Sequence, residues 1–415
     1  MSLAAEDAPV SGKSVGTVSI AILVATGLGA AITLAFPRLL PATEVETFLA
    51  FWGLLMGLGS ALNPLEQEVS RLSALARGEG RPTSGAALQT AAVAGGLIIL
   101  VSVLVLLPPV TNRLVGGHGE LVLIAVVGGL AFTAQYCVRG LLVGQDRIRL
   151  YGGIIVTEAL IRLVLIGVVV LAGLTGMVWL AVAVALGSFA WLAFAVTSAR
   201  LVDWRGGWQP WRAVAGRIVI LMISAGLTAC VITGYPVLVK LLASSGESTA
   251  VGALFSALTL ARLPLLLFSP VQAMAVPAVV RLSHSEDGRR QLRALLVKIV
   301  LGALGLALVG AALGGLIGPW ILSVIYPNLA PVAGWAVAGL VWSSVLMAAV
   351  LLFAAVMVAN TRVDHVLITW GVVVAVSALL LLFAPGDTVF RAVLGLAVAP
   401  TAGLGVAVAL VLRRR

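Results

Sequence analysis

The stretch LTLARLPLLLFSPVQAMAVP, residues 258–277, decides which class of fold the chain adopts. It is mostly apolar and holds one cation, Arg262, which is followed by Pro264, Pro270 and Pro277. The rest of the chain is similar, because 61% of its 415 residues are hydrophobic and only 10% are charged. About a quarter of the residues in a soluble domain are charged. The composition therefore predicts an all-α polytopic membrane protein.

Twelve segments are long enough to cross about 30 Å of hydrocarbon at a rise of 1.5 Å per residue. We expect them near 15–36, 45–68, 84–108, 121–142, 150–173, 176–199, 215–240, 249–277, 295–317, 330–358, 363–384 and 390–411. The loops between them are too short for a folded soluble domain, and no glycine-rich phosphate loop is present to hold ATP.

The Lys and Arg residues of the loops predict the orientation in the membrane. If the N-terminus is cytoplasmic, the loops and termini on that side hold 20 of the 26 cations. The opposite loops hold Arg38, Arg113, Lys240 and Arg391. Both termini are therefore expected in the cytoplasm of a bacterial cell, with the chain crossing its cytoplasmic membrane. The net charge of +10 then belongs to membrane loops and does not indicate a nucleic-acid partner.

A basic linker divides the chain into two halves of six helices. We expect an N-terminal lobe over 1–200, a cytoplasmic amphipathic linker over 201–214 and a C-terminal lobe over 215–415. The triplet Arg-Leu-Ser after the second helix, at 71–73, recurs after the eighth, at 281–283. Because six is an even number, both halves start on the same side and form a parallel repeat, which predicts two lobes around a central cavity.

Charges within the expected helices are candidate functional residues, because a cation at mid-membrane costs at least about 2.5–3.5 kcal/mol unless it faces protein or water. Arg262 lies near the middle of its helix and either faces the cavity or bonds carbonyls that the nearby prolines free. Glu158 and Arg162 form an i, i+4 pair, which is either a structural pin or a part of the cavity.

The fourth helix adds Gln135, Tyr136 and Arg139, which have either a packing role or a role in substrate contact. Hinges are expected where proline or glycine interrupts a helix, because proline removes a backbone hydrogen bond. The candidate hinge residues are Gly234, Pro236, Pro264, Pro270 and Pro277.

Other charged residues have simpler explanations at the sequence level. Glu66 and Glu68 lie near the cytoplasmic end of the second helix, where water solvates them, and Lys240 is expected to extend outward to the membrane surface. Glu44 and Glu46 form an acidic pair in the first outer loop, a position that some membrane-embedded glycosyltransferases use. Such enzymes carry larger outer loops than this chain, so we expect no enzyme.

No metal or cofactor is predicted. The histidines His118, His284 and His365 are dispersed, and the two cysteines, Cys137 and Cys230, lie far apart in apolar runs. These residues form neither a metal-binding constellation nor a disulfide framework.

The run VLVKLLASSGESTAVGALFSALTLARLPLLLFSPVQAMAVPAVVRLS, residues 237–283, resembles bacterial polysaccharide flippases. These belong to the multidrug/oligosaccharidyl-lipid/polysaccharide exporter superfamily. Gly318-Pro319-Trp320 with Ile325-Tyr326-Pro327 is similar to the end of the family's ninth helix. RGLLVGQDRIRLY, residues 139–151, is similar to its connection between the fourth and fifth helices.

The resemblance implies a flippase for a lipid-linked oligosaccharide or polysaccharide precursor that works by alternating access. Arg262 would attract the diphosphate of a polyprenyl carrier. The implied partners are this lipid-linked glycan, membrane lipids and other proteins of cell-envelope polysaccharide assembly. A coupling ion, proton or sodium, stays open, because the family often has an acidic residue where Tyr235 stands. A drug or cation antiporter of the same superfamily is the alternative, although residues 15–36 lack the carboxylate common in such antiporters.

Overall fold

The computed structural model describes residues 12–80, 84–174, 176–196, 206–242, 248–263, 265, 286–359 and 363–412. Within these ranges the chain forms helices and no strand. Ten of the described helices are long and apolar enough to cross a membrane, and two shorter apolar helices, Val24–Leu39 and Thr249–Ala261, accompany them. The predicted all-α polytopic fold is therefore confirmed.

The first half of the chain forms six membrane elements and a short surface helix. The six are α1 (Gly12–Leu39), α2 (Ala42–Gly78), α3 (Ser84–Val105), α5 (Gly119–Gly144), α6 (Ile148–Leu171) and α7 (Met177–Leu186), which continues as the 3-10 helix η1 (Gly187–Phe194). The short helix α4 (Pro108–Val115) begins with a proline, whose missing N–H has no partner in a first turn. It ends at Gly116, whose φ of 62° is in the left-handed region that favours glycine.

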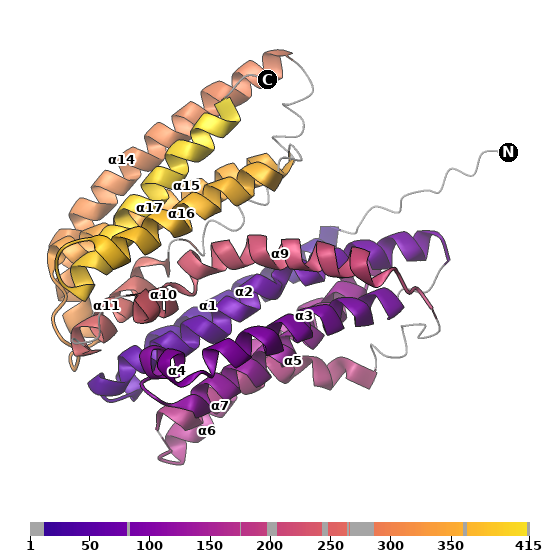
Figure 1. Ribbon diagram of the computed structural model, residues 1–415, viewed down its shortest axis with the longest axis horizontal. Coiled ribbons are helices and arrows are strands. Elements are labelled where there is room, and N and C mark those ends of the chain that lie inside the picture. The colour runs from indigo at the N-terminus through magenta and orange to yellow at the C-terminus, as the bar shows by residue number, and fades with distance from the viewer. Residues whose placement is uncertain are drawn as a thin grey trace.

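The second half forms six further membrane elements, of which the first is interrupted. They are α9 (Trp211–Ile232) with α10 (Tyr235–Leu242), then α11 (Ser248–Ala261), α14 (Glu286–Ile325), α15 (Gly334–Ala359), α16 (Val363–Phe383) and α17 (Thr388–Leu412). In Figure 1, α14 to α17 form one bundle, the helices of the first half form the other, and α9 lies between them.

Helix α2 packs closely on α5, because glycines on α5 remove the side chains that would separate the two backbones. A Cβ on Gly140 would lie 2.6 Å from the carbonyl oxygen of Glu66, and one on Gly144 would lie 2.5 Å from that of Ser70. Small residues allow this kind of approach in membrane helices, where van der Waals packing drives association. The contact fixes the C-terminal half of α2 in the first lobe.

The seventh membrane helix is interrupted, whereas the sequence predicted one span over 215–240. α9 ends at Ile232, and the N–H of Gly234 bonds back to the carbonyl of Ala229 at 2.7 Å. Pro236, which has no N–H, then occupies the first turn of α10. Gly234 and Pro236 thus lie at the break itself. The other three candidate hinges, Pro264, Pro270 and Pro277, lie outside the described residues.

The two lobes contact each other at the end that carries the predicted outer loops. The Nε of Arg38, at the end of α1, donates to the carbonyl of Ile325 at the end of α14 over 2.6 Å. The Nζ of Lys240 in α10 lies 2.9 Å from Glu46 in α2, with side chains only 16% and 8% exposed. The expectation that Lys240 extends outward was therefore wrong, because a buried carboxylate holds it. From these contacts the lobes diverge toward the opposite end (Figure 1).

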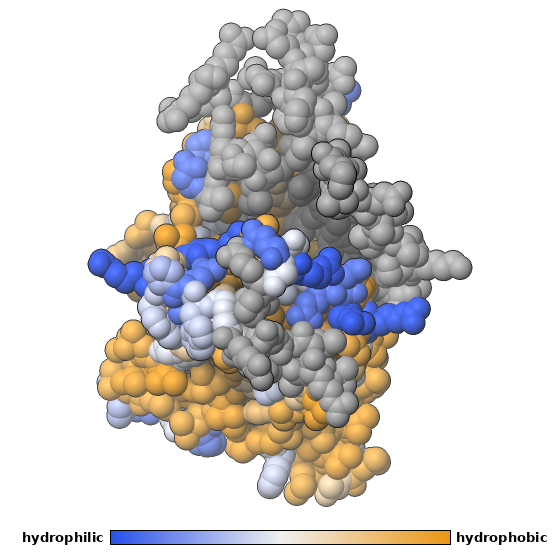
Figure 2. Space-filling model, turned by 90° about the vertical axis from the view of Figure 1, so that its right-hand side faces the viewer, coloured by the Kyte–Doolittle hydropathy of each residue, from blue (hydrophilic) through white to orange (hydrophobic). Residues whose placement is uncertain are grey.

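The opposite end carries the predicted cytoplasmic loops and a band of hydrophilic residues. Figure 2 shows this face, with blue residues gathered between apolar surfaces. Exposed cations of these loops include Arg77, Arg147 and Arg149. The linker segment 206–210 lies against the start of α3, where the N–H of Gly85 donates to the carbonyl of Gly206 over 2.9 Å.

Candidate functional site

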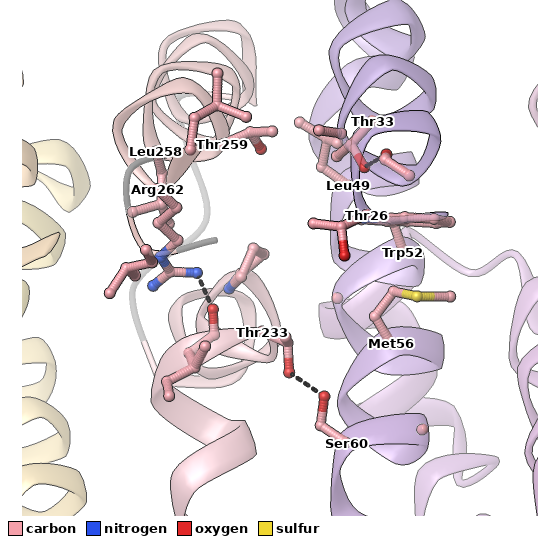
Figure 3. A pocket seen from close by; sticks show the side chains of 18 of the residues that line it. Thr26, Thr33, Leu49, Trp52, Met56, Ser60, Thr233, Leu258, Thr259 and Arg262 are labelled. Atoms are coloured by element: carbon pink, nitrogen blue, oxygen red, sulfur yellow. Dashed lines mark hydrogen bonds between the residues drawn. The ribbon is translucent and has the colours of Figure 1, made fainter. Parts of the chain in front are cut away.

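A cavity of about 430 Å³ lies between the two lobes. Its walls come from α1, α2, α5 and α6 on one side and from the break in the seventh helix and α11 on the other. Figure 3 shows the α11 wall, with Arg262, facing the α2 wall, with Trp52 and Met56. The volume is within the range of pockets that bind small ligands, which is roughly 300–1,000 Å³.

Arg262 lies just beyond the last residue of α11 and lines this cavity. Its Nη2 donates to the carbonyl of Val231 over 2.7 Å, and its Nη1 donates to the carbonyl of Ile232. In an unbroken helix the carbonyl of Ile232 would accept from residue 236, but Pro236 has no N–H. The guanidinium thus supplies donors that the break removes. Two of its five N–H groups are used in this way, and the other three have no hydrogen-bond partner among the residues that the structure describes.

Glu158 and Arg162 form the ion pair that their spacing predicted, with 2.7 Å between Arg162 Nη2 and Glu158 Oε1. Both residues line the cavity. Gln135, which is fully buried, donates to the other carboxylate oxygen of Glu158 over 2.6 Å. The Nε of Arg162 donates to the carbonyl of Val184 in α7 over 3.1 Å. The structure therefore joins three of the candidate site residues into one network.

Tyr136 and Arg139 belong to a second polar group that extends toward the C-terminal end of α5. Tyr136 lines the main cavity, and the Arg139 guanidinium carbon lies 5.0 Å from the centre of its ring. Arg139 Nε lies 2.9 Å from Glu66 Oε2, and each of these side chains is 12% exposed. Tyr151 accepts a hydrogen bond from Arg139 at 3.5 Å. The expectation that water solvates Glu66 was wrong, because Arg139 neutralises it within the lobe.

A second cavity of about 300 Å³ adjoins the first. It is lined by Arg139 and Tyr151, and the two cavities share the lining residues Thr26, Gly29, Trp52, Glu158 and Arg162. The polar group of the first lobe is therefore accessible from a continuous region of space between α1, α2 and α6.

Glu68 is also paired rather than solvated. It accepts hydrogen bonds from Arg71 at 2.9 Å and from Arg217 of α9 at 2.6 Å. Glu46 is held by Lys240, and neither Glu44 nor Glu46 is among the residues that line the main cavity. The acidic pair considered for a glycosyltransferase therefore has a structural contact at Glu46.

The charged side chains in the described lining of the main cavity are Glu158, Arg162 and Arg262. Glu158 and Arg162 neutralise each other, whereas Arg262 is bound to neutral carbonyls. This part of the lining therefore has a net charge of +1. Among the residues that the structure describes, no group of three His, Cys, Asp or Glu side chains could hold a metal ion.

Several lining residues were not recognised in the sequence. Trp52 is one, and five hydroxyl side chains are the others: Thr26, Thr33, Ser60, Thr233 and Thr259. A signal was present, because Trp52, Met56 and Ser60 recur at i, i+4 and i+8 on one face of α2. Single polar residues in apolar helices are also common in ordinary helix packing, so the pattern alone did not indicate a cavity.

Comparisons with known proteins agree with this architecture. No model of a known protein family matches the chain. The Mycobacterium tuberculosis protein Rv1510 is 32% identical over 99% of this chain and 94% of its own length. An inward-facing multidrug resistance MATE family transporter of the MOP superfamily superimposes with a TM-score of 0.67 at 17% identity, over 96% of this chain and 98% of its own. The lipid II flippase MurJ, in an inward closed conformation, gives 0.66 at 13% identity, over 95% and 87%.

Proposed function

The chain belongs to the same protein family as Rv1510, and we propose that it is a transporter that moves a lipid-linked oligosaccharide or polysaccharide precursor across the bacterial cytoplasmic membrane. The carrier lipid would be a polyprenyl diphosphate, and transport would proceed by alternating access. The fold, which is that of MATE transporters and of MurJ, supports a transporter rather than an enzyme. Other partners would be proteins that assemble cell-envelope polysaccharide.

The surplus cation in the cavity carries this proposal. Arg262 faces the space between the lobes, and no carboxylate among the described lining residues neutralises it. A planar guanidinium can bind two phosphate oxygens at once, which favours an anionic lipid diphosphate. The bonded carbonyls hold the guanidinium in place before substrate enters, so binding loses less side-chain conformational entropy.

The closed outer end supports alternating access. The bonds Arg38–Ile325 and Lys240–Glu46 hold the lobes together there, and the lobes diverge toward the predicted cytoplasmic end. A substrate made in the cytoplasm would enter from that side. Breaking the Arg38–Ile325 contact would then open the cavity to the exterior.

The same fold in MATE transporters makes a drug or cation antiporter the competing function. A free carboxylate would favour a cationic substrate, and the one carboxylate in the described lining, Glu158, is bound by Arg162 and Gln135. A coupling ion, proton or sodium, is compatible with either function.

The test is translocation in liposomes that contain the purified protein. A fluorescent polyprenyl diphosphate carrying a short glycan is placed in one leaflet, and its appearance in the other is followed by a membrane-impermeant quencher. We expect Arg262→Ala to slow translocation at least about a hundredfold, since a hydrogen bond to a charged group contributes about 1.5–3 kcal/mol and two are lost. Arg262→Lys should restore only a part, because lysine lacks the planar fork.

Arg149→Ala is the matched control, because Arg149 is an exposed arginine at the start of α6, outside the cavity. It should translocate at the wild-type rate. Wild-type translocation by Arg262→Ala, at equal protein level, would reduce Arg262 to a structural role at the helix break. Efflux of a cationic dye with no movement of the lipid would favour the antiporter.

A further inference from the structure

Trp52 is the largest aromatic side chain in the described lining of the cavity, and it lies on the wall opposite Arg262 (Figure 3). It extends from the middle of α2 and lines both adjoining cavities. Its ring meets Phe36 edge-on, with 5.2 Å between the centroids, so its position is fixed from behind. A rigid, partly exposed indole in a membrane-embedded cavity is available for contact with a ligand.

Hydroxyl groups line the cavity on both of its walls. Thr33 donates to the carbonyl of Gly29 over 2.7 Å, and Thr259 donates to that of Phe255 over 3.0 Å. Each hydroxyl oxygen has two lone pairs, so both can still accept hydrogen bonds. The cavity is therefore apolar at Trp52, rich in acceptors at its threonines and cationic at Arg262.

Ser60 and Thr233 join the two walls at one edge of the cavity. The hydroxyl of Thr233, at the break in the seventh helix, donates to Ser60 Oγ on α2 over 3.5 Å (Figure 3). Thr233 also donates to the carbonyl of Ala229 at 3.1 Å. The contact to Ser60 is long, and the single hydroxyl proton of Thr233 is shared with the carbonyl of Ala229. A ligand hydroxyl can therefore replace the contact between the walls at little free-energy cost.

We propose that Trp52 and the threonine and serine hydroxyls that line the cavity form the subsite for the first sugar of the substrate, with Arg262 as the subsite for its phosphates. This inference rests on the proposed function and specifies which side chains recognise which part of the substrate. A pyranose ring has an apolar C–H face, which packs on an aromatic ring, and a rim of hydroxyl groups, which donate to the threonine oxygens. The carrier diphosphate, bonded to that sugar, then reaches the opposite wall.

The chemistry of the wall selects against the alternatives. A lipophilic cation could pack on Trp52, but it has no set of hydroxyl donors for the threonine acceptors and would face the unneutralised Arg262. A bare lipid diphosphate satisfies Arg262 and leaves the indole and the hydroxyls without partners. Polar groups left without a partner in a buried site discriminate strongly against the incomplete ligand.

The experiment compares two fluorescent probes in the same liposomes: polyprenyl diphosphate carrying one hexose, and polyprenyl diphosphate without sugar. We expect Trp52→Leu to slow the glycosylated probe roughly tenfold more than the bare probe, the amount that an aromatic contact contributes. Trp52→Tyr should keep most of the discrimination, because it keeps an aromatic face. Arg262→Ala should slow both probes.

Trp179→Leu is the matched control, since Trp179 is 53% exposed on α7 and does not line the cavity. It should leave the ratio of the two rates unchanged. The inference is overturned if Trp52→Leu slows both probes equally, which would make Trp52 a packing residue between α1 and α2, or if it slows neither probe.

A binding measurement distinguishes a failure of this inference from a failure of the proposed function. Purified protein in detergent is titrated with a short-chain glycosyl diphosphate and with the same compound without sugar, and the gain in Tm is measured. For wild-type protein and for Trp179→Leu, the glycosyl diphosphate should raise the Tm more than the compound without sugar does. For Trp52→Leu the two compounds should raise the Tm equally. If wild-type protein moves neither lipid probe, the proposed transport fails, and this sugar-dependent gain still decides whether the subsite exists. Its absence in wild-type protein overturns the subsite.

Discussion

Arg162 and Arg262, the two arginines near the middle of predicted membrane helices, are bound to carbonyls where a neighbouring element changes its form. Arg162 binds Val184, two residues before α7 ends and η1 begins. Arg262 binds Val231 and Ile232, where α9 ends. Carbonyls at such positions lose helical partners, and water is absent to replace them. These hydrogen bonds offset the cost of burying each guanidinium and the cost of burying the carbonyls at a helix end.

At the scale of single residues we expect Glu158 and Arg162 to be strongly coupled. Glu158→Gln leaves Arg162 charged in a site where it is 11% exposed, and breaking a buried pair costs about 3–5 kcal/mol. The double variant Glu158→Gln with Arg162→Gln leaves no charge and should lose less stability than the single change. Chemical unfolding in detergent of the two single variants and the double variant gives the coupling energy.

The exposed pair His118–Glu120 is the control for this cycle. Its atoms are 2.8 Å apart, about as close as those of the buried pair, but each side chain is 48% exposed. Removing Glu120 should cost less than about 1 kcal/mol. Strict additivity of the single changes at Glu158 and Arg162 would mean that the two residues stabilise the protein independently, contrary to the geometry.

The sequence predicted the buried arginines but not their partners. An apolar run makes a charge conspicuous, and the i, i+4 spacing of Glu158 and Arg162 defines their contact within one helix. The carbonyls that bind Arg262 lie about thirty residues earlier, on a different element. Such a contact depends on where α9 ends and on how α9 packs against α11, which is tertiary information. The same reason hid Trp52 and the partners of Glu66.

At the scale of elements, the interrupted seventh helix is held against α2 along its whole length. Glu68 of α2 binds Arg217 of α9 near one end, and Glu46 of α2 binds Lys240 of α10 near the other. Between these ion pairs the break lies on Gly53, where an added Cβ would be 3.0 Å from the carbonyl oxygen of Thr233. The break and the glycine surface of α2 therefore fit each other.

Two glycines on this surface make a matched pair of variants. Gly53→Ala would push the Thr233 carbonyl away, and we expect a lower Tm. At Gly57, four residues on, an added Cβ would lie 3.7 Å from the Cα of Gly234, which is an ordinary contact. Gly57→Ala should keep or raise the Tm, because alanine favours a helix over glycine by roughly 0.5–1 kcal/mol. Equal Tm values for the two variants would show that the contact at Gly53 is loose.

Sequence reasoning at this scale found the position of the break but not its form. Gly234 and Pro236 predicted a kink, yet the run is mostly apolar between Arg217 and Lys240 and gave no reason to expect two helices. Proline within an apolar helix either bends it or ends it, and the outcome depends on whether another group satisfies the freed carbonyl. Here Arg262 satisfies it, so the helix ends at Ile232.

At the scale of the molecule, composition alone was sufficient to predict the all-α polytopic fold. Without water in the membrane core every backbone group needs an internal partner, which leaves helices as the only form for apolar runs of this length. The contacts that close the outer end, Arg38–Ile325 and Lys240–Glu46, could not be predicted. They join residues almost two hundred or more positions apart, and nothing local to either partner specifies the other.

The orientation makes a prediction for the whole chain. Cys137 and Cys230 are first replaced by alanine, and one cysteine is then introduced at an exposed site, Gly78→Cys at the end of α2 or Leu174→Cys after α6. A membrane-impermeant maleimide should label Leu174→Cys in intact cells and Gly78→Cys only after permeabilisation, because the cations gather on the side of Gly78. The reverse pattern would place both termini outside the cell.

The seventh helix belongs to the second half of the chain by sequence, but its ion pairs bind it to α2 of the first half. Arg217 of α9 contacts Glu68, and Lys240 of α10 contacts Glu46. A rocking motion that preserves these bonds would carry seven helices against five, with its pivot after Leu242 rather than in the linker before Trp211. A cut in that linker would then fall within the seven-helix part, whose two pieces the ion pairs to Glu46 and Glu68 would still join.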